Sequence, residues 1–285
     1  MKVFIDGELF DGAAGRIPVN DHGLLYGDGV FEGIRVFGGK PFLLDEHLRR
    51  MAYGLRAVHL SLPGGLPRLR EAVLTTVAAH AASDSYVRLI VTRGDGPLGV
   101  DPAGCPAPRV ICIVDRIEIF PDEVRRAGIS LATVSMRRPA ADVVDPRVKS
   151  LNYLNNALAR IEARRQGADD ALLLNQSGLV AEASVANLFV VHGEQLWTPL
   201  TTDGALDGVT RAVVLSLGRQ AGLRTSERSL SRTDFFAASE AFLTGTGAGI
   251  VRIRSLDGEL IGGGETECAP VTERLMDAYE TLTRA

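Results

Sequence analysis

The chain has 285 residues, of which 46% are hydrophobic and 23% are charged, and its net charge is −4. This length suggests two domains or one large one and is enough to bury a substantial core. The acidic balance argues against a nucleic-acid partner, which needs a basic surface. Apolar runs are too short to span a membrane, and acidic residues and glycine interrupt any signal-peptide core at 1–7. We therefore expect a cytoplasmic protein.

The cysteines and histidines predict no metal site. The chain has an odd number of cysteines, Cys105, Cys112 and Cys268. Neither these three cysteines nor the five histidines show the spacing of metal ligands. Three scattered cysteines fit a reducing cytosol, and we interpret them as structural residues.

The first half of the chain predicts an α+β domain over residues 1–115. Helical spacing places Leu44, Leu48, Met51 and Leu55 on one face of a predicted helix. The predicted strands are 3–5, 8–10, 30–37, 86–92 and 109–114, and the predicted helices are 44–57 and 66–82.

Residues 116–128 contain Pro121 and several charges, and we predict that they form a linker. The larger domain then covers 129–285. Its predicted strands are 129–135, 171–175, 180–183, 187–191, 196–198 and 241–244. Its predicted helices are 151–166, 209–221 and 271–283, and a polar loop is expected at 137–147.

Lys149 is the most informative residue of the chain. Lys2 and Lys40 are the only other lysines, whereas arginines are common. Lys149 lies between a rigid Asp-Pro turn at 145–146 and a helical pattern. A lysine amine can form a Schiff base with an aldehyde, which the permanently protonated guanidinium of arginine cannot do. For a lone lysine, an ordinary surface position is the commoner explanation. The remaining motifs therefore decide between a surface lysine and a Schiff-base lysine.

Glu182 places a carboxylate among small apolar residues on the predicted strand 180–183. Burying a charge is costly unless it is paired. A buried Glu182 would need a cationic partner, such as a protonated ring nitrogen. Strand alternation leaves a second possibility, a glutamate on the solvent-facing side of the strand.

Two glycine-led turns offer backbone N–H groups to an anion. Gly208 precedes Val209 and Thr210 at the start of a predicted helix, where the helix dipole favours negative charge. The second turn, 245–249, could bring N–H groups and Thr246 to a phosphate or carboxylate. It does not suit a dinucleotide, because no strand–helix–strand unit fits before the C-terminus. If neither turn binds an anion, the turn at Gly208 is a plain helix cap and the turn at 245–249 is a tight turn between elements.

Tyr86 and Arg88 are two residues apart on a predicted strand, so their side chains point to the same face. A phenol and a guanidinium on one face suit recognition of a carboxylate. The structural alternative is an ion pair for Arg88 and core packing for Tyr26 and Phe31.

These motifs occur together in the order and spacing of one known family. The chain resembles the class IV, fold-type IV pyridoxal-phosphate aminotransferases, and most closely the branched-chain amino acid aminotransferases. The resemblance covers essentially the whole chain and implies a small N-terminal α/β domain, a larger C-terminal domain with a β-barrel-like core and surrounding helices, and a homodimer. The motifs that carry it are 30–35, 149–153, 182 with 187–189, 208–211 and 245–246.

The resemblance implies a role for each matching residue. Lys149 resembles the lysine that binds the cofactor, pyridoxal 5′-phosphate, as a Schiff base. Glu182 resembles the carboxylate that keeps the pyridine nitrogen protonated, and Tyr153 the contact to the phenolic oxygen. The residues that resemble the phosphate site are Arg50, Val209, Thr210, Gly245 and Thr246. The residues that resemble the substrate pocket are Tyr26, Phe31, Tyr86 and Arg88, with Gly247 and Ala248 as backbone donors to the substrate carboxylate.

The implied reaction moves an amino group between a branched-chain (aliphatic) amino acid and 2-oxoglutarate by a ping-pong mechanism. Arg88 is the candidate for the γ-carboxylate. The chain departs from the best-known branched-chain enzymes at 183–187 and at 198–200, which leaves the substrate preference open.

Three alternatives remain. D-amino acid and (R)-amine aminotransferases share the fold, the lysine and the glutamate, and sequence does not show the chirality of the substrate. Aminodeoxychorismate lyase is a relative that eliminates pyruvate. A non-catalytic binding protein could keep the fold, although the intact set of Lys149, Glu182 and Arg50 argues against it.

Overall fold

The computed structural model describes residues 1–264 and 269–284, so Cys268 lies outside the described residues. The chain forms two compact units. The first contains Met1–Ile117 and Val148–Asn152, and the second contains Glu118–Arg147 and the chain from Tyr153 onward. The segment that carries Lys149 therefore belongs to the first unit, although its neighbours in sequence belong to the second.

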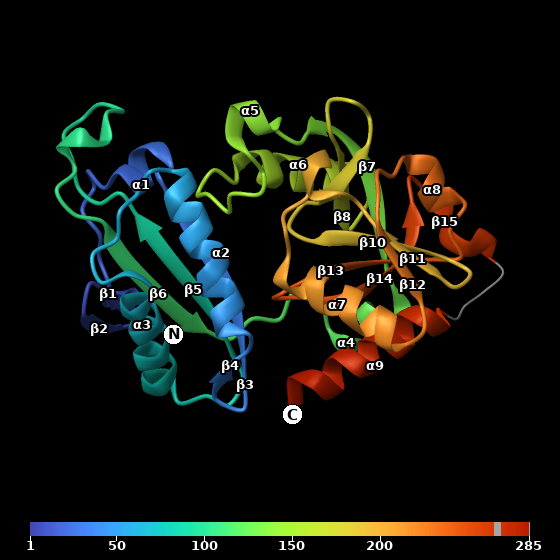
Figure 1. The fold of residues 1–285 in the computed structure, drawn as a ribbon, viewed down its shortest axis with the longest axis horizontal. Coiled ribbons are helices and arrows are strands. Elements are labelled where there is room, and N and C mark those ends of the chain that lie inside the picture. The colour runs from blue at the N-terminus through green and yellow to red at the C-terminus, as the bar shows by residue number, and fades with distance from the viewer. Residues whose placement is uncertain (265–268, 285) are drawn as a thin grey trace. The chain divides into compact units, whose positions relative to one another are not determined.

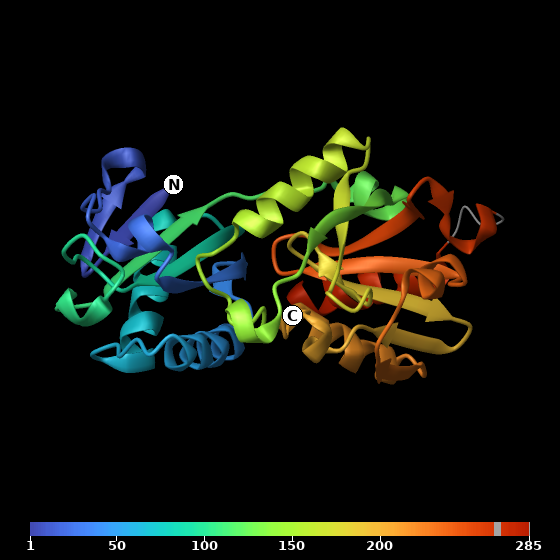
Figure 2. The ribbon, with the colours of Figure 1, turned by 90° about the horizontal axis from the view of Figure 1, so that it is seen from above.

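The first unit is a six-stranded antiparallel sheet with the strand order β2-β1-β6-β5-β3-β4. Helices α2 and α3 lie on the same side of this sheet (Figures 1 and 2). The strands are β1 Lys2–Ile5, β2 Glu8–Asp11, β3 Gly29–Phe37, β4 Lys40–Pro41, β5 Ser85–Thr92 and β6 Arg109–Asp115. The helices are α1 His22–Tyr26, α2 Leu44–Ala57 and α3 Gly65–His80, with short 3-10 helices at Gly12–Ala14 and Pro102–Gly104.

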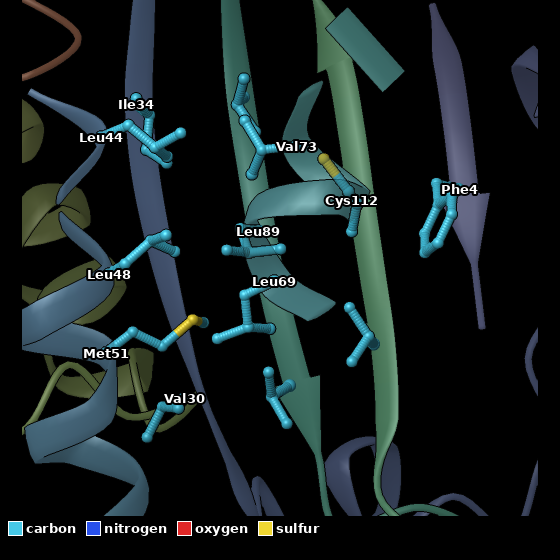
Figure 3. Close-up of a cluster of buried hydrophobic side chains, with 14 of the residues drawn as sticks. Phe4, Val30, Ile34, Leu44, Leu48, Met51, Leu69, Val73, Leu89 and Cys112 are labelled. Atoms are coloured by element: carbon cyan, nitrogen blue, oxygen red, sulfur yellow. The ribbon is translucent and has the colours of Figure 1, made fainter. Parts of the chain in front are cut away.

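The core of the first unit lies between the sheet and its two helices. Figure 3 shows Leu44, Leu48 and Met51 of α2 pointing toward the sheet, where Ile34 and Leu89 are fully buried. Each such side chain contributes about 1.5–3 kcal/mol by leaving water. Alternation along the strands then places Phe31, Gly33 and Arg35, and likewise Tyr86 and Arg88, on the sheet face away from these helices.

The second unit is built on a nine-stranded mixed sheet with the order β12-β11-β10-β13-β14-β7-β8-β9, with β15 paired to β14. The sheet curls and carries helices around it (Figure 1), which confirms the expected barrel-like core. The strands are β7 Ile129–Arg137, β8 Asp170–Leu174, β9 Val180–Ala183, β10 Asn187–His192, β11 Gln195–Thr198, β12 Arg224–Glu227, β13 Glu240–Gly245, β14 Gly249–Leu256 and β15 Glu259–Leu260.

Two short helices of the second unit lie in segments that the sequence predicted to be a linker or a loop. Segment 116–128, expected as a linker, contains the helix α4, and the polar loop 137–147 contains the single turn α5. The helices are α4 Asp122–Ala127, α5 Ala141–Val144, α6 Leu154–Arg165, α7 Val209–Gln220, α8 Arg232–Phe236 and α9 Pro270–Arg284, with 3-10 helices at Thr201–Asp203 and Ile261–Gly264.

The predicted start of the helix at 151 is wrong, since α6 begins at Leu154. The preceding residues pair with strand β3 instead. The N–H of Phe31 donates to the Lys149 carbonyl at 2.9 Å, and the N–H of Leu151 donates to the Gly29 carbonyl at 3.0 Å. These tertiary hydrogen bonds outweigh the local helical pattern and hold Lys149 in an extended segment.

Among the described residues, no helix combines the length and the apolar character that crossing a membrane requires. In the same part of the chain, no group of three or more histidine, cysteine or acidic side chains is arranged to hold a metal ion.

Candidate active site

Lys149 contacts one wall of the predicted substrate pocket. Its Nζ atom lies 4.5 Å from the centre of the Phe31 ring, and the Cζ atom of Arg88 lies 4.5 Å from the same centre. Phe31 is 6% exposed, so both cations contact a largely dehydrated aromatic face, where cation–π attraction is strongest. The structure therefore brings together three residues that the sequence singled out separately.

Tyr86 lies beside Arg88 on the same sheet face, as the strand spacing predicted. The Cζ atom of Arg88 is 5.8 Å from the centre of the Tyr86 ring. A Cβ atom built on Gly33 would overlap the Tyr86 hydroxyl oxygen. Glycine is thus required at position 33 for the Tyr86 side chain to lie across the neighbouring strand.

Tyr26 ends the short helix α1 and is 37% exposed, so core packing does not explain it. Its ring is nearly perpendicular to the His22 ring, with ring centres 4.9 Å apart, and its hydroxyl oxygen accepts a hydrogen bond from the Gly99 N–H at 2.8 Å. The phenol is therefore anchored at its oxygen while much of the side chain remains accessible.

Arg50 is held by a buried carboxylate. Its Nε and Nη2 atoms each donate to Glu32 at 2.7 Å, and the imidazole of His47 contacts Glu32 at 2.8 Å. Glu32 is fully buried and Arg50 is 11% exposed. Burial would raise the pKa of Glu32, but Arg50 and His47 outweigh it and lower that pKa to about 2. The guanidinium is thus fixed in a bidentate arrangement on the helix-covered side of strand β3.

Glu182 is 4% exposed, which excludes a solvent-facing position on its strand. One carboxylate oxygen, Oε1, pairs with the Nη2 atom of Arg138 at 2.7 Å. The other oxygen, Oε2, accepts from the Leu206 N–H at 2.9 Å and from the Asn187 amide at 3.4 Å. The buried charge is paired, as its burial requires. Sequence reasoning missed Arg138, because it belongs to a polar loop with no recognisable motif.

Asn187 connects three of the predicted elements of the second unit. Besides contacting Glu182, its amide donates to the Leu206 carbonyl at 2.8 Å. A Cβ atom on Gly208 would overlap the Asn187 Oδ1 atom, so a larger residue at 208 would displace the Asn187 side chain. Asn187 also pairs with Thr244 across strands β10 and β13. Glu182, the start of α7 and the end of β13 therefore meet around one residue.

Val209 and Thr210 form the first turn of α7, whose N-cap, Gly208, has no side chain with which to cap the helix. Backbone N–H groups at such a helix start attract anions.

Gly245 ends strand β13, and 246–248 form the turn that leads into β14. The buried hydroxyl of Thr244, next to Gly245, has no hydrogen-bond partner among the described residues. Tyr153 is half-buried at the N-cap of α6.

The predicted site residues thus fall into one set on each unit. The set on the first unit contains Tyr26, Phe31, Arg50, Tyr86, Arg88 and Lys149. The set on the second unit contains Tyr153, Glu182, Val209, Thr210, Gly245, Thr246, Gly247 and Ala248.

These residues suit the chemistry of pyridoxal phosphate. A lysine amine such as that of Lys149 can bind the cofactor's aldehyde, and a buried carboxylate such as that of Glu182 can pair with a cationic ring nitrogen. Backbone N–H groups at a helix start such as that of α7, and an oriented guanidinium such as that of Arg50, can bind a phosphate. Each polar part of the cofactor has a chemically matched group in the chain.

Known sequences are similar to this chain over most of its length. The family described as Amino-transferase class IV matches residues 29–256. A putative branched-chain-amino-acid aminotransferase of Methanocaldococcus jannaschii is 39% identical over 282 residues, which cover 99% of this chain and 96% of that protein.

Solved structures are similar over the same length. The Escherichia coli branched-chain amino acid aminotransferase has a TM-score of 0.94 at 30% identity, covering 99% of this chain and 94% of that one. A branched-chain amino acid aminotransferase from T.th., complexed with N-(5′-phosphopyridoxyl)-L-glutamate, has a TM-score of 0.91 at 30% identity and the same coverage. A 4-amino-4-deoxychorismate lyase of Pseudomonas aeruginosa has a lower TM-score of 0.85 at 30% identity, covering 99% of this chain and 100% of that one.

The family match, the near full-length similarity and the cofactor-compatible residues point to the same assignment. The chain belongs to the class IV aminotransferases and is a pyridoxal-phosphate-dependent transaminase.

Proposed function

We propose that this enzyme moves the amino group between a branched-chain (aliphatic) amino acid and 2-oxoglutarate in a ping-pong cycle. The observation that carries this proposal is the face shared by Phe31, Tyr86 and Arg88, which offers both apolar surface and a cation. A ping-pong enzyme needs both in one pocket, because its two substrates differ in the charge of their side chains. The names of the similar proteins support the same substrate class.

Lys149 and Glu182 would act at the reacting end of the cofactor. When bound, pyridoxal phosphate supplies the electron sink that makes the substrate Cα proton removable. Lys149 would hold the aldehyde covalently until an amino acid displaces it, and its freed amine would then move the proton at Cα. Glu182 would hold the ring nitrogen in its protonated form, and Tyr153 would contact the phenolic oxygen.

The phosphate would be held mainly by hydrogen bonds that do not involve Lys149. Arg50, already oriented by Glu32, would supply the cationic donor. The first turn of α7, with Val209 and Thr210, would supply backbone N–H groups and a hydroxyl. Gly245 and Thr246, at the end of strand β13 and in the turn after it, would complete the phosphate-binding residues. Phosphate binding and covalent attachment are therefore separable functions of the chain.

The substrate would meet the first unit through its side chain. Tyr26, Phe31 and Tyr86 would form apolar surface for an aliphatic group, and Arg88 would bind the γ-carboxylate of glutamate or 2-oxoglutarate. Gly247 and Ala248 would donate backbone N–H groups to the α-carboxylate. From the family resemblance, we also propose that the enzyme is a homodimer located in the cytoplasm. Light scattering, which measures the mass of the assembly, would test the dimer.

Arg88→Ala should separate the two substrate types. We expect the KM for 2-oxoglutarate and glutamate to rise about 10- to 100-fold, because a charge-assisted hydrogen bond contributes roughly 1.5–3 kcal/mol. Leucine and valine, which have no second carboxylate, should change by less than about threefold. Steady-state kinetics with each substrate measure the difference, and equal losses for all four would contradict the proposed role.

A half-reaction screen tests the proposed function as a whole. The purified enzyme with pyridoxal phosphate is mixed with single L-amino acids, D-amino acids or (R)-amines, and the visible band of the cofactor is followed. We expect leucine, valine, isoleucine and glutamate of the L-series to shift the band. A response to D-amino acids or (R)-amines alone would favour the other aminotransferase activities. Release of pyruvate from aminodeoxychorismate would favour a lyase, and the absence of any response would indicate a non-catalytic protein.

A further inference from the structure

Arg138 is a buried arginine with no role in the function described so far. It is 6% exposed and follows strand β7, where its backbone N–H donates to the Leu174 carbonyl at 2.9 Å. Its guanidinium contacts three groups. Nη2 pairs with Glu182 at 2.7 Å, Nη1 donates to the Asn156 Oδ1 atom at 3.3 Å, and Nε donates to the Gly204 carbonyl at 3.2 Å. All these residues belong to the second unit.

The contacts on Arg138 are themselves fixed. The amide of Asn156, on α6, donates to the Ser184 carbonyl at 2.6 Å, so its oxygen is turned toward Arg138. A Cβ atom built on Gly204, whose φ is +109°, would lie 3.3 Å from the Arg138 Cβ atom and 3.4 Å from the Ala181 Cβ atom. The planar guanidinium is thus held in one orientation by three different segments, which a flexible lysine amine could not reproduce.

A buried ion pair gives little net stability, because removing both charges from water costs about as much as their attraction returns. Apolar residues could fill the same volume around Ala181 and Ala183. Stability alone therefore does not account for a buried Glu182–Arg138 pair. This indicates that the negative charge of Glu182 serves binding or catalysis, and that Arg138 keeps this charge in place.

We propose that Arg138 is a positioning residue for Glu182, which fixes the direction of the carboxylate and balances its charge so that it remains an anion facing the ring nitrogen of pyridoxal phosphate. This inference rests on the proposed role of Glu182. Arg138 forms an ion pair with Oε1 and the Leu206 N–H donates to Oε2, so the carboxylate cannot rotate without losing the ion pair and that hydrogen bond.

The charge on Arg138 decides where a proton between Glu182 and the ring nitrogen resides. A buried carboxylate that loses its counter-ion is stabilised by taking up a proton. Without Arg138, the proton of the ring nitrogen would move to Glu182, and the nitrogen would become neutral. A neutral ring accepts electrons less well, so the removal of the substrate Cα proton would slow.

Nitrogen-15 NMR of the enzyme reconstituted with ring-15N-labelled pyridoxal phosphate measures this directly. We expect the wild-type signal at the position of a protonated pyridine and the Arg138→Gln signal displaced toward the neutral position. The turnover number should fall roughly 10- to 100-fold, by analogy with residues that orient the ligands of a metal ion. A wild-type 15N shift in Arg138→Gln would overturn the inference.

Arg138→Lys separates charge from orientation. The lysine keeps the positive charge, so the ring nitrogen of the bound cofactor should stay protonated. It lacks the planar guanidinium that orients Glu182, so the turnover of this variant should still fall. Wild-type turnover in Arg138→Lys would overturn the positioning role. This variant also keeps the inference testable if Arg138→Gln fails to fold.

Arg160→Gln is the matched control. Arg160 lies on α6 of the same unit, is 27% exposed, and is 3.8 Å from the buried carboxylate of Asp170. Its replacement should leave the 15N shift unchanged, whereas a displaced shift would indicate a general effect of losing an ion pair and would overturn the inference. A wild-type protein that binds no cofactor at Lys149 would instead contradict the proposed function itself.

Discussion

Lys149→Ala is expected to lose turnover by at least about a thousandfold while still binding pyridoxal phosphate, because removing a covalent nucleophile removes the step that it performs. Binding should survive because the groups proposed for the phosphate, Arg50 and the first turn of α7, do not depend on the lysine amine. Equilibrium dialysis measures the retained cofactor, and a coupled assay measures turnover. Normal turnover in the variant would remove Lys149 from the mechanism.

Borohydride reduction identifies the attachment point independently of activity. After reduction and proteolysis, mass spectrometry should find the pyridoxyl group on Lys149 of the wild type and nowhere on Lys149→Ala. Lys40, an exposed residue on β4, provides the matched control, since Lys40→Ala should keep both the label and the turnover. A label on Lys2 or Lys40 in the wild type would indicate a non-specific reaction.

The helices that the sequence predicted well are those whose apolar residues recur at helical spacing. The predicted helix 44–57 is observed as Leu44–Ala57, and 209–221 as Val209–Gln220. Each buries one face against its own unit, so a local sequence pattern is enough to predict it. Strand β12, with the exposed polar sequence Arg224–Glu227, has no such pattern and forms only because it pairs with β11.

The site shows a similar division between local chemistry and long-range pairing. Glu182 is recognisable in the sequence because a carboxylate is unusual among small apolar residues on a strand. Its partner Arg138 lies 44 positions earlier, and nothing in the sequence around Arg138 indicates that pairing. The same holds for Glu32, which is part of a predicted strand but whose partners, His47 and Arg50, are set by the packing of α2 on the sheet. Sequence therefore indicates reactive groups more readily than the groups that orient them.

Glu32→Gln should be strongly destabilising. Replacing one partner of a buried ion pair leaves the other charge uncompensated, which typically costs about 3–5 kcal/mol. Here the residual charge would be that of Arg50, which is 11% exposed and donates two charge-assisted hydrogen bonds to Glu32. Urea denaturation should show a lower midpoint with an unchanged slope.

The low pKa of Glu32 also gives the wild type a specific acid sensitivity. Its folded-state pKa of about 2 lies below the value of about 4.3 expected for an unfolded glutamate. The stabilisation is fully present above the unfolded value and is lost progressively as the pH falls from there toward 2. The difference in the free energy of unfolding between wild type and Glu32→Gln should therefore shrink as the pH is lowered across this range.

Glu46→Gln separates this buried network from ordinary surface charge. Glu46 lies on the same helix as Arg50, and its side chain is 41% exposed and pairs with Arg49 one turn away. Its loss should change stability by less than about 1 kcal/mol, the usual limit for an exposed pair. If Glu32 also orients Arg50 for the phosphate, Glu32→Gln should weaken the binding of pyridoxal phosphate under conditions where it remains folded, and Glu46→Gln should not. Equal cofactor affinity in the two variants would limit Glu32 to a role in stability.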